Sequence, residues 1–302
     1  MSSQAPPPSS PSPGVAAGAA RARRFRAQGW RPGVLPGFAP TLTFTVASLS
    51  MLVIIPLGFM ILKTASLSWA DFITTVTSDR ALAAYRLSFG GALVAGAVNA
   101  VAGFLLAWIL VRYDFFGKGL VDALIDLPLA LPTAVAGIAL TAIYAPNGVL
   151  GQFLEGIGIK VAFSPIGVIV AMIFVGLPFA VRTVQPVLME IDPQAEEAAA
   201  VLGASRWFAF RRVILRALIP ALLTGFGLAF ARAVGEYGSI VFISGNMPMV
   251  TEIVPLLIVT KLEQYQYQEA TALAVVMLVG SFLTLLLVNF LQSRSRKGHA
   301  RG

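Results

Sequence analysis

Residues 192–205 read DPQAEEAAAVLGAS, and this stretch lies between two long apolar runs. Asp192 and Pro193 favour the start of a helix, because an aspartate can cap the N–H groups of a first turn and proline at the first position has no N–H to leave unpaired. Gly203 stands where a residue with positive φ would end that helix, and Ser205 can cap the next one. The stretch therefore predicts a short surface helix, a turn, and a second helix that leads back into an apolar run.

The composition of the chain places those apolar runs in a membrane. Of the 302 residues, 57% are hydrophobic and 12% are charged, against roughly 45–50% and about 25% in soluble domains. A helix needs about 20 mainly apolar residues to cross the bilayer, and six such runs are present: 41–62, 87–111, 120–144, 165–181, 217–243 and 270–291. The shorter apolar stretch 249–262 is interpreted as a re-entrant or interfacial helix. The sequence thus predicts an all-α integral membrane protein with six transmembrane helices.

The distribution of basic residues predicts the orientation in the membrane. Lys and Arg accumulate in the short cytoplasmic segments of membrane proteins. With the N-terminus inside, sixteen of the 22 Lys and Arg residues fall on the cytoplasmic side, whereas a seventh span would move the four C-terminal ones outside. We therefore expect a multi-pass protein with both termini in the cytoplasm. The net charge of +8 then reflects orientation and headgroup contacts, and we expect no nucleic-acid partner.

The two ends of the chain are predicted to be tails. Residues 1–40 begin with a charge-free tract of Pro, Ser, Ala and Gly and then carry five Arg residues, so we expect a disordered, basic cytoplasmic tail. A cleaved signal peptide is disfavoured, because the apolar run that follows is longer than the roughly 7–15 residues usual in such peptides. Residues 41–63 are expected to remain as the first transmembrane helix, and residues 292–302 to form a basic cytoplasmic tail.

The loop after the fourth span resembles a known motif. Glu-Ala-Ala at 197–199, Gly203 and Val-Ile-Leu at 213–215 resemble the EAA loop of bacterial binding-protein-dependent ABC importer permeases. The resemblance implies a type I ABC importer permease fold over residues 84–291. It also implies that the loop, residues 190–216, is a coupling helix that docks on a separate ATP-hydrolysing subunit.

Two positions depart from the family's motif. Val213 replaces isoleucine, which changes little, and Arg216 stands where proline is usual, which puts the helix bend at the membrane entry in question. The resemblance implies a set of residues for the contact with the ATPase. They are Glu196, Glu197, Ala198, Ala199, Gly203, Arg206 and Arg211.

The chain has no phosphate-binding loop of its own. The nearest fragment to G-x4-G-K-[ST] is Gly-Lys-Gly at 117–119, which lacks both the spacing and the hydroxyl residue. We therefore expect a transport subunit without catalytic residues or a bound cofactor, with ATP used by partner ATPase subunits. Because the chain has no Cys and one His, we expect no metal site either.

Two further segments resemble sulfate/thiosulfate permeases. Residues 122–137 read DALIDLPLALPTAVAG and resemble a segment of sulfate/thiosulfate and molybdate permeases, and residues 232–239 read RAVGEYGS and resemble the T subunit of the sulfate system. Tyr237 favours sulfate, since molybdate relatives usually have phenylalanine there. The resemblance implies a bacterial inner-membrane importer with a second homologous permease, an ABC ATPase dimer and a periplasmic sulfate-binding protein. The alternative is a molybdate or tungstate permease, which more often forms a homodimer.

Arg232 is the candidate for a contact with the anion. A charge within a span costs about 2.5–3.5 kcal/mol on insertion scales, so it usually faces the bundle interior or a watery cavity. Glu236, four residues further on, can pair with it, and a pair that merely orients the fifth span is the other interpretation. Asp122 and Asp126 fit either the helix dipole or a contact with a neighbouring subunit. The candidate path residues are Arg232, Glu236, Tyr237 and Ser239.

Two other classes of protein remain as alternatives. An integral membrane enzyme would need converging acid, base or metal groups, and the predicted spans hold few ionisable residues and neither His nor Cys. A proton-coupled secondary transporter is compatible with carboxylates in spans. It would take up its substrate without an ATPase, whereas a permease subunit would co-purify with one.

Overall fold

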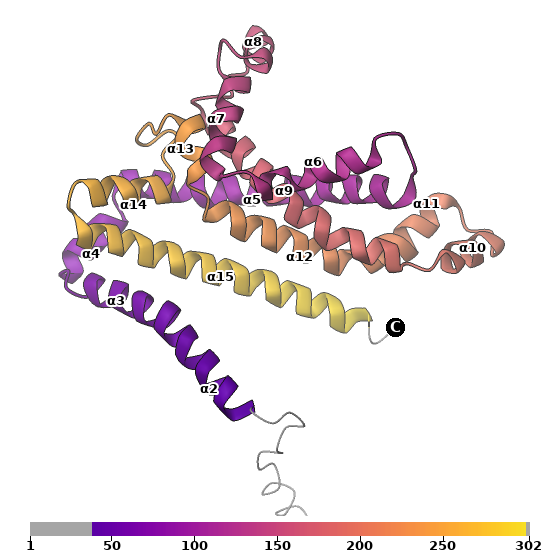
Figure 1. Cartoon of the computed structure of the whole chain (residues 1–302), viewed down its shortest axis with the longest axis horizontal. Coiled ribbons are helices and arrows are strands. Elements are labelled where there is room, and N and C mark those ends of the chain that lie inside the picture. Colours follow the sequence, from indigo (N-terminus) through magenta and orange to yellow (C-terminus); the bar gives the residue numbers. More distant parts are fainter. Residues whose placement is uncertain (1–37, 300–302) are drawn as a thin grey trace, which may run out of the picture. The chain divides into compact units, whose positions relative to one another are not determined.

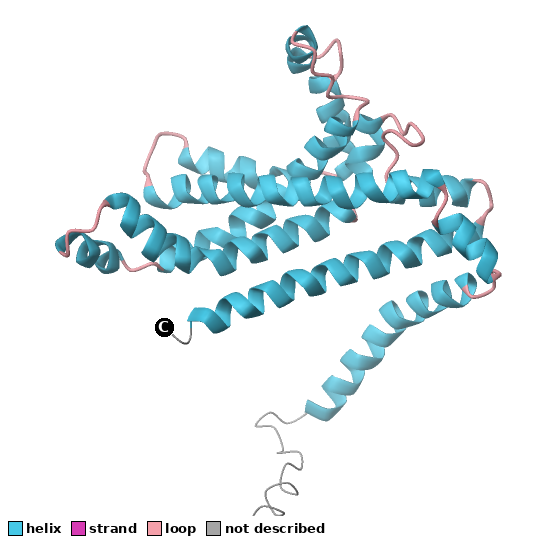
Figure 2. Ribbon diagram, turned by 180° about the vertical axis from the view of Figure 1, so that it is seen from behind, coloured by secondary structure: helices cyan, strands magenta, loops and turns pink. Residues whose placement is uncertain are grey.

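The computed structural model describes residues 38–299, and every regular element in this part of the chain is a helix (Figures 1 and 2). The chain divides into two compact units, Met1–Gly58 and Phe59–Gly302. Most of the tail predicted at 1–40, and residues 300–302 of the second tail, lie outside the described residues. Helix α15 (Tyr267–His299) continues through most of the C-terminal segment.

The first apolar run forms one continuous helical stretch. It consists of α2 (Phe38–Leu49), a π-helical turn η1 (Ser50–Ile54) and α3 (Ile55–Thr64). The π-turn ends two residues before Pro56, which lacks the N–H that would continue a regular ladder of helix hydrogen bonds. The part of this stretch that is long and apolar enough to cross a membrane is Pro40–Thr64, which agrees with the predicted span.

Three long helices form the core of the second unit. They are α5 (Asp79–Arg112), α9 (Pro165–Glu190) and α12 (Leu215–Val234), and α12 continues α11 (Arg206–Ala209) and the π-turn η2 (Phe210–Ile214). Close packing depends on small residues: a Cβ on Gly103 of α5 would come within 2.7 Å of the Cβ of Ala180 on α9. The two ends of this core are called the Arg112 end and the Arg80 end, after residues near the two ends of α5.

The third predicted span, over 120–144, is formed by two helices that meet at a sharp bend. It consists of α6 (Lys118–Ala130) and α7 (Thr133–Tyr144), which meet at 116°. The cause is Pro132: proline disfavours the helical conformation in the residue before it, and Leu131 is extended, with φ −80° and ψ 138°. The described residues contain five helices long enough to span a membrane, or six spans if this bent pair is one.

The fifth predicted span is also interrupted, which corrects the expectation of a helix over 217–243. Helix α12 ends at Val234, and a separate α13 (Gly238–Ser244) follows after Gly235. The span extends in the opposite direction instead, over Arg206–Val234. A charge that was expected inside the span, Arg232, therefore lies in its last turn.

Shorter helices surround both ends of the core. At the Arg80 end lie α4 (Trp69–Val76) and α14 (Val254–Glu263), and at the Arg112 end lies α10 (Pro193–Val201) (Figure 1). Helix α8 (Val149–Gly156) follows α7, and both extend away from the core helices in Figure 1. Helix α14 has only ten residues, too few to cross the bilayer, which fits the prediction of an interfacial or re-entrant segment.

Candidate functional site

The loop between α9 and α11 has the local structure that its residues predict. Asp192 Oδ1 accepts a hydrogen bond of 2.9 Å from Gln194 N at the start of α10. Gly203 has φ +79°, and no atom lies within 4 Å of the position that a Cβ would take, so its backbone conformation, and not a lack of space, favours glycine. The bond from Ala204 N to Ala199 O, 3.0 Å long, closes the helix end as in a Schellman motif. Ser205 then caps α11.

An exposed apolar surface lies at the end of α10. Val201 and Leu202 are 87% and 86% exposed, and Trp207 of α11 is 68% exposed. Glu197 and Ala198 are exposed on the same short helix. The sequence analysis did not select Val201, Leu202 or Trp207 as contact residues. The feature that could have identified them is the presence of large apolar residues on both sides of the helix-ending Gly203.

Glu196 is turned away from that surface toward the core. Its carboxylate forms an ion pair with Arg112 in the last turn of α5. The two arginines predicted to contact an ATPase are both exposed: Arg206 lines a cavity of about 460 Å³ together with Glu196, and Arg211 lines a neighbouring groove of about 590 Å³. The predicted contact residues therefore lie on more than one face of the loop.

A second cluster occupies the break between α12 and α13. Arg232 Nη1 lies 2.5 Å from Glu236 Oε2, and Glu236 Oε1 accepts hydrogen bonds of 2.9 Å from both N and Oγ of Ser239. The carboxylate is buried, whereas 31% of the Arg232 side chain is exposed. The pair expected from the sequence therefore exists, but across a helix end and not along one helix. Tyr237 is the residue before α13 and is partly exposed.

The two helix breaks lie against each other. A Cβ on Gly137 of α7 would come within 2.4 Å of the backbone oxygen of Ser239, and one on Gly238 within 2.1 Å of Thr133 Oγ1. Glycine at both positions is therefore required for this close approach. The packing fixes the segment that carries Glu236 and Ser239 onto the start of α7.

A third charged cluster joins α6 to α9. Arg182 donates from Nε and Nη2 to the two carboxylate oxygens of Asp126, at 2.9 and 2.5 Å, and from Nη1 to Asp122 Oδ1 and Gln185 Oε1, at 2.7 and 2.6 Å. Both aspartates thus have a partner within the chain, where the sequence suggested the helix dipole or another subunit. The sequence offered no sign of this pairing, because 56 to 60 residues separate the partners.

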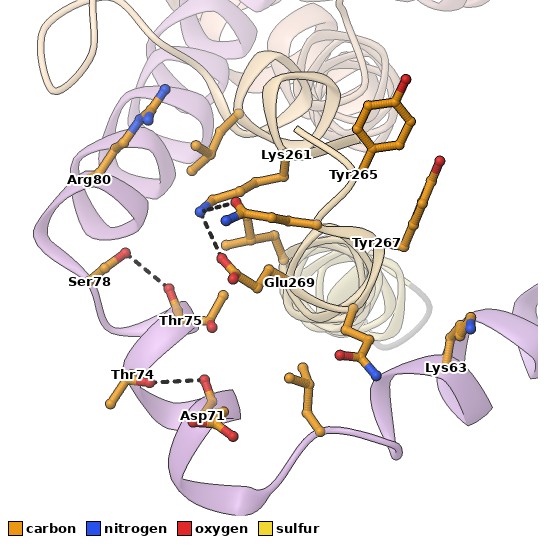
Figure 3. A pocket seen from close by; sticks show the side chains of 15 residues that line it. Lys63, Asp71, Thr74, Thr75, Ser78, Arg80, Lys261, Tyr265, Tyr267 and Glu269 are labelled. Carbon is orange, nitrogen blue, oxygen red and sulfur yellow. Dashed lines mark hydrogen bonds and ion pairs between the residues drawn. The ribbon is translucent and has the colours of Figure 1, made fainter. Parts of the chain in front are cut away.

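A polar groove of about 810 Å³ opens at the Arg80 end, between α4 and the ends of α14 and α15 (Figure 3). Lys261 Nζ bonds to Glu269 Oε2 at 2.7 Å and to Gln266 Oε1 at 2.9 Å within it. Tyr265 and Tyr267 stand at its edge with ring centroids 6.2 Å apart. The groove is therefore lined by charges of both signs and by exposed aromatic rings.

Comparison with known proteins identifies the family. A family model described as "binding-protein-dependent transport system inner membrane component" matches residues 99–297, about two thirds of the chain. The chain belongs to this family. Members of this family are membrane components of transport systems, so this chain is a transport subunit.

Individual relatives cover almost the whole chain of this inner-membrane component. The sulfate transport system permease protein CysT of Salmonella typhimurium is 46% identical over 261 residues, which cover 86% of this chain and 94% of the relative. CysT of Escherichia coli is 45% identical over the same shares of both chains. A CysT from Synechocystis is 47% identical over 84% of this chain and 88% of the relative.

Solved structures support the fold. A chain from a bacterial ABC transporter involved in the import of the acidic polysaccharide alginate superposes with a TM-score of 0.70 at 18% identity, covering 85% of this chain and 94% of that one. A second structure of a bacterial alginate ABC transporter, in complex with an alginate-bound periplasmic protein, gives the same TM-score at 19% identity. The fold is therefore that of a type I ABC importer permease.

Proposed function

We propose that this chain is the membrane-spanning permease subunit of an ATP-driven importer of sulfate, with thiosulfate as a second substrate. The observation that carries this proposal is the 46% identity to a sulfate transport permease over 94% of that protein's length. ATP is hydrolysed by separate subunits, and this chain contributes half of the translocation pathway. The other half comes from a second, homologous permease.

In this proposal α10 is the element that meets the ATPase. Val201 and Leu202 are almost fully exposed, and large apolar side chains that are removed from water on association supply most of the binding energy of an interface. Glu197 and Ala198 belong to the same contact. This places the Arg112 end in the cytoplasm, in agreement with the excess of basic residues predicted for that side.

The anion passes the cluster at the break between α12 and α13. Glu236 receives three interactions, one from Arg232 and two from Ser239. In the described contacts Arg232 uses only Nη1, whereas a guanidinium has five N–H donors in a planar fork that suits an oxyanion. Arg232 is therefore able to hold Glu236 and still offer donors to a passing sulfate.

The polar groove at the Arg80 end (Figure 3) is the place where a periplasmic sulfate-binding protein contacts this subunit. It is lined by Lys63, Arg80 and Lys261, by two acidic residues and by two tyrosines. Tyrosine is enriched at binding hot spots, and charges of both signs favour a polar protein surface. In this orientation the groove opens to the periplasm.

Uptake of labelled sulfate tests the proposal. The chain is expressed with its neighbouring transport genes in bacteria that lack their own sulfate permease, and thiosulfate, molybdate and tungstate are added as competitors. We expect ATP-dependent sulfate uptake that thiosulfate suppresses and molybdate leaves unchanged. If molybdate suppresses the uptake of labelled sulfate and thiosulfate does not, the chain is a molybdate or tungstate permease. Sulfate uptake that persists without an ATPase subunit contradicts the proposal.

A further inference from the structure

Helix α5 is held at both ends by an ion pair with a segment distant in sequence. At one end Arg112 binds Glu196 of α10. At the other end Arg80 donates from Nε and Nη2 to the two carboxylate oxygens of Glu252, both at 2.7 Å. The 34 residues of α5 form a continuous helix of about 50 Å at 1.5 Å per residue. One helix thus connects α10 to the segment that precedes α14.

The contact at the Arg80 end is tight. The Glu252 side chain is 1% exposed, and a buried carboxylate requires its partner because an unpaired charge in the interior is strongly unfavourable. Next to it, Val254 N donates a 2.9 Å hydrogen bond to Ser88 Oγ, another residue of α5. The segment before α14 therefore has to follow any displacement of this end of α5.

The contact at the Arg112 end is the link between α10 and α5. Among the described side chains of α10, Glu196 is the one with an ion pair or hydrogen bond to another helix. A cavity of about 460 Å³ lies beside it, lined also by Trp108 and Arg206. The ion pair is therefore the polar contact that joins the described side chains of α10 to α5.

The side chain of Arg112 packs against a cluster of aromatic rings. Its guanidinium carbon lies 5.3 Å from the ring centroid of Trp108, within the range of a cation–π interaction. Trp108 packs edge-on against Phe210 at 5.6 Å, and both rings contact Phe104. This aromatic cluster holds the position of Arg112 on α5 and ties α5 to the π-turn η2.

We propose that Arg112 is a positioning residue that transmits movement of α10 to α5, and that Arg80 passes this movement to the Glu252 segment at the opposite end. The inference rests on the proposed function, in which an ATPase displaces α10. It assigns Glu196 to transmission within the chain, and Glu197 to the ATPase contact. Helix α5 then acts as a rigid connection between the Arg112 end, where the ATPase binds, and the Arg80 end, where substrate is delivered.

Neutralising either partner tests the link. The complex with its ATPase is reconstituted, and the sulfate transported per ATP hydrolysed is measured for Arg112→Gln, Glu196→Gln and the charge exchange R112E/E196R. We expect the ratio to fall about fivefold or more in each neutral variant, the lower range of allosteric couplings, and to recover in the exchange. ATPase co-purification should stay within about twofold of the unmodified complex, because a partly exposed ion pair contributes little to docking.

The chain supplies a matched control. Lys118 and Asp114 form an ion pair of 2.8 Å at the same end, and neither has a described hydrogen bond or ion pair to α10, so Lys118→Gln should leave the ratio unchanged. An unchanged ratio in Arg112→Gln overturns the inference, and so does failure of the charge exchange to recover it. Loss of ATPase co-purification in Arg112→Gln also overturns it, since Arg112 would then act in docking.

A second readout separates this inference from the choice of substrate. The chain contains no cysteine, so Val250→Cys, at an exposed position two residues before Glu252, reports on that segment through labelling by a membrane-impermeant maleimide. We expect ATP with vanadate to change the labelling rate about fivefold or more, and Arg112→Gln to abolish the change. A complex that imports no sulfate but shows this pattern contradicts only the proposed function; labelling that does not depend on nucleotide overturns the inference.

Discussion

Gly203 provides the sharpest test of the coupling loop. Its φ of +79° lies in the left-handed region, where a residue with a Cβ carries a strain of roughly 1–2 kcal/mol. No heavy atom lies within 4 Å of the added Cβ, so the strain is conformational and not steric. That energy changes the population of the native turn by a factor of about 5–30. We therefore expect Gly203→Val to insert normally but to lose most ATPase co-purification and stimulated ATP hydrolysis.

Two further variants make this prediction specific. Gly203→Asn should retain most of the coupling, since asparagine tolerates the left-handed conformation better than other residues with a Cβ. Gly119→Val is the matched control: Gly119 lies at the same end, also has open space around its Cβ, and has no positive φ. Full ATPase stimulation in Gly203→Val would refute the reasoning. Equal losses in the valine and asparagine variants would refute it too, because side-chain size and not φ would then decide.

Three other expectations follow from the same contacts. Arg232→Gln should depress sulfate uptake and leave ATPase co-purification intact; unchanged uptake excludes a path role for Arg232. The double change V201S/L202S should weaken ATPase co-purification about tenfold or more, because each side chain contributes roughly 1.5–3 kcal/mol when fully buried, and normal co-purification would remove α10 from the contact. Gly137→Val should lower the free energy of unfolding by about 1–3 kcal/mol, the usual cost of overpacking, because its Cβ would meet the Ser239 backbone oxygen at 2.4 Å; thermal denaturation in detergent measures this.

Controls for these variants come from the same chain. Arg86 is an exposed arginine near the N-terminal end of α5 with no described ion pair to Glu236, so Arg86→Gln reports the effect of removing an arginine that does not pair with that carboxylate. Gly90 lies in α5 with no atom within 4 Å of a Cβ, and Gly90→Val should leave the thermal midpoint nearly unchanged. A drop as large as that of Gly137→Val would show that valine in a helix, and not the clash, lowers stability.

Features that depend on neighbouring residues were predictable. The cap at Asp192, the turn at Gly203 and the cap at Ser205 involve backbone groups within a few residues, so local residue types suffice to predict them. The apolar runs were equally clear, because a span of about 20 residues leaves a long compositional signal. The end of the fifth helix at Val234 was not predicted, since the apolar character of the sequence continues beyond it while the helix does not.

The sequence by itself determined that this is a helical membrane protein with a short surface helix between two spans, because length, hydropathy and capping are local properties. Only the tertiary structure decided which charges meet. Arg112 and Glu196 are 84 residues apart in the sequence, and Arg80 and Glu252 are 172 residues apart. No local sequence pattern around any of these residues identifies its partner. Their pairing follows from the packing of α5, α9 and α12, which brings distant helix ends together and places these charges beside opposite charges.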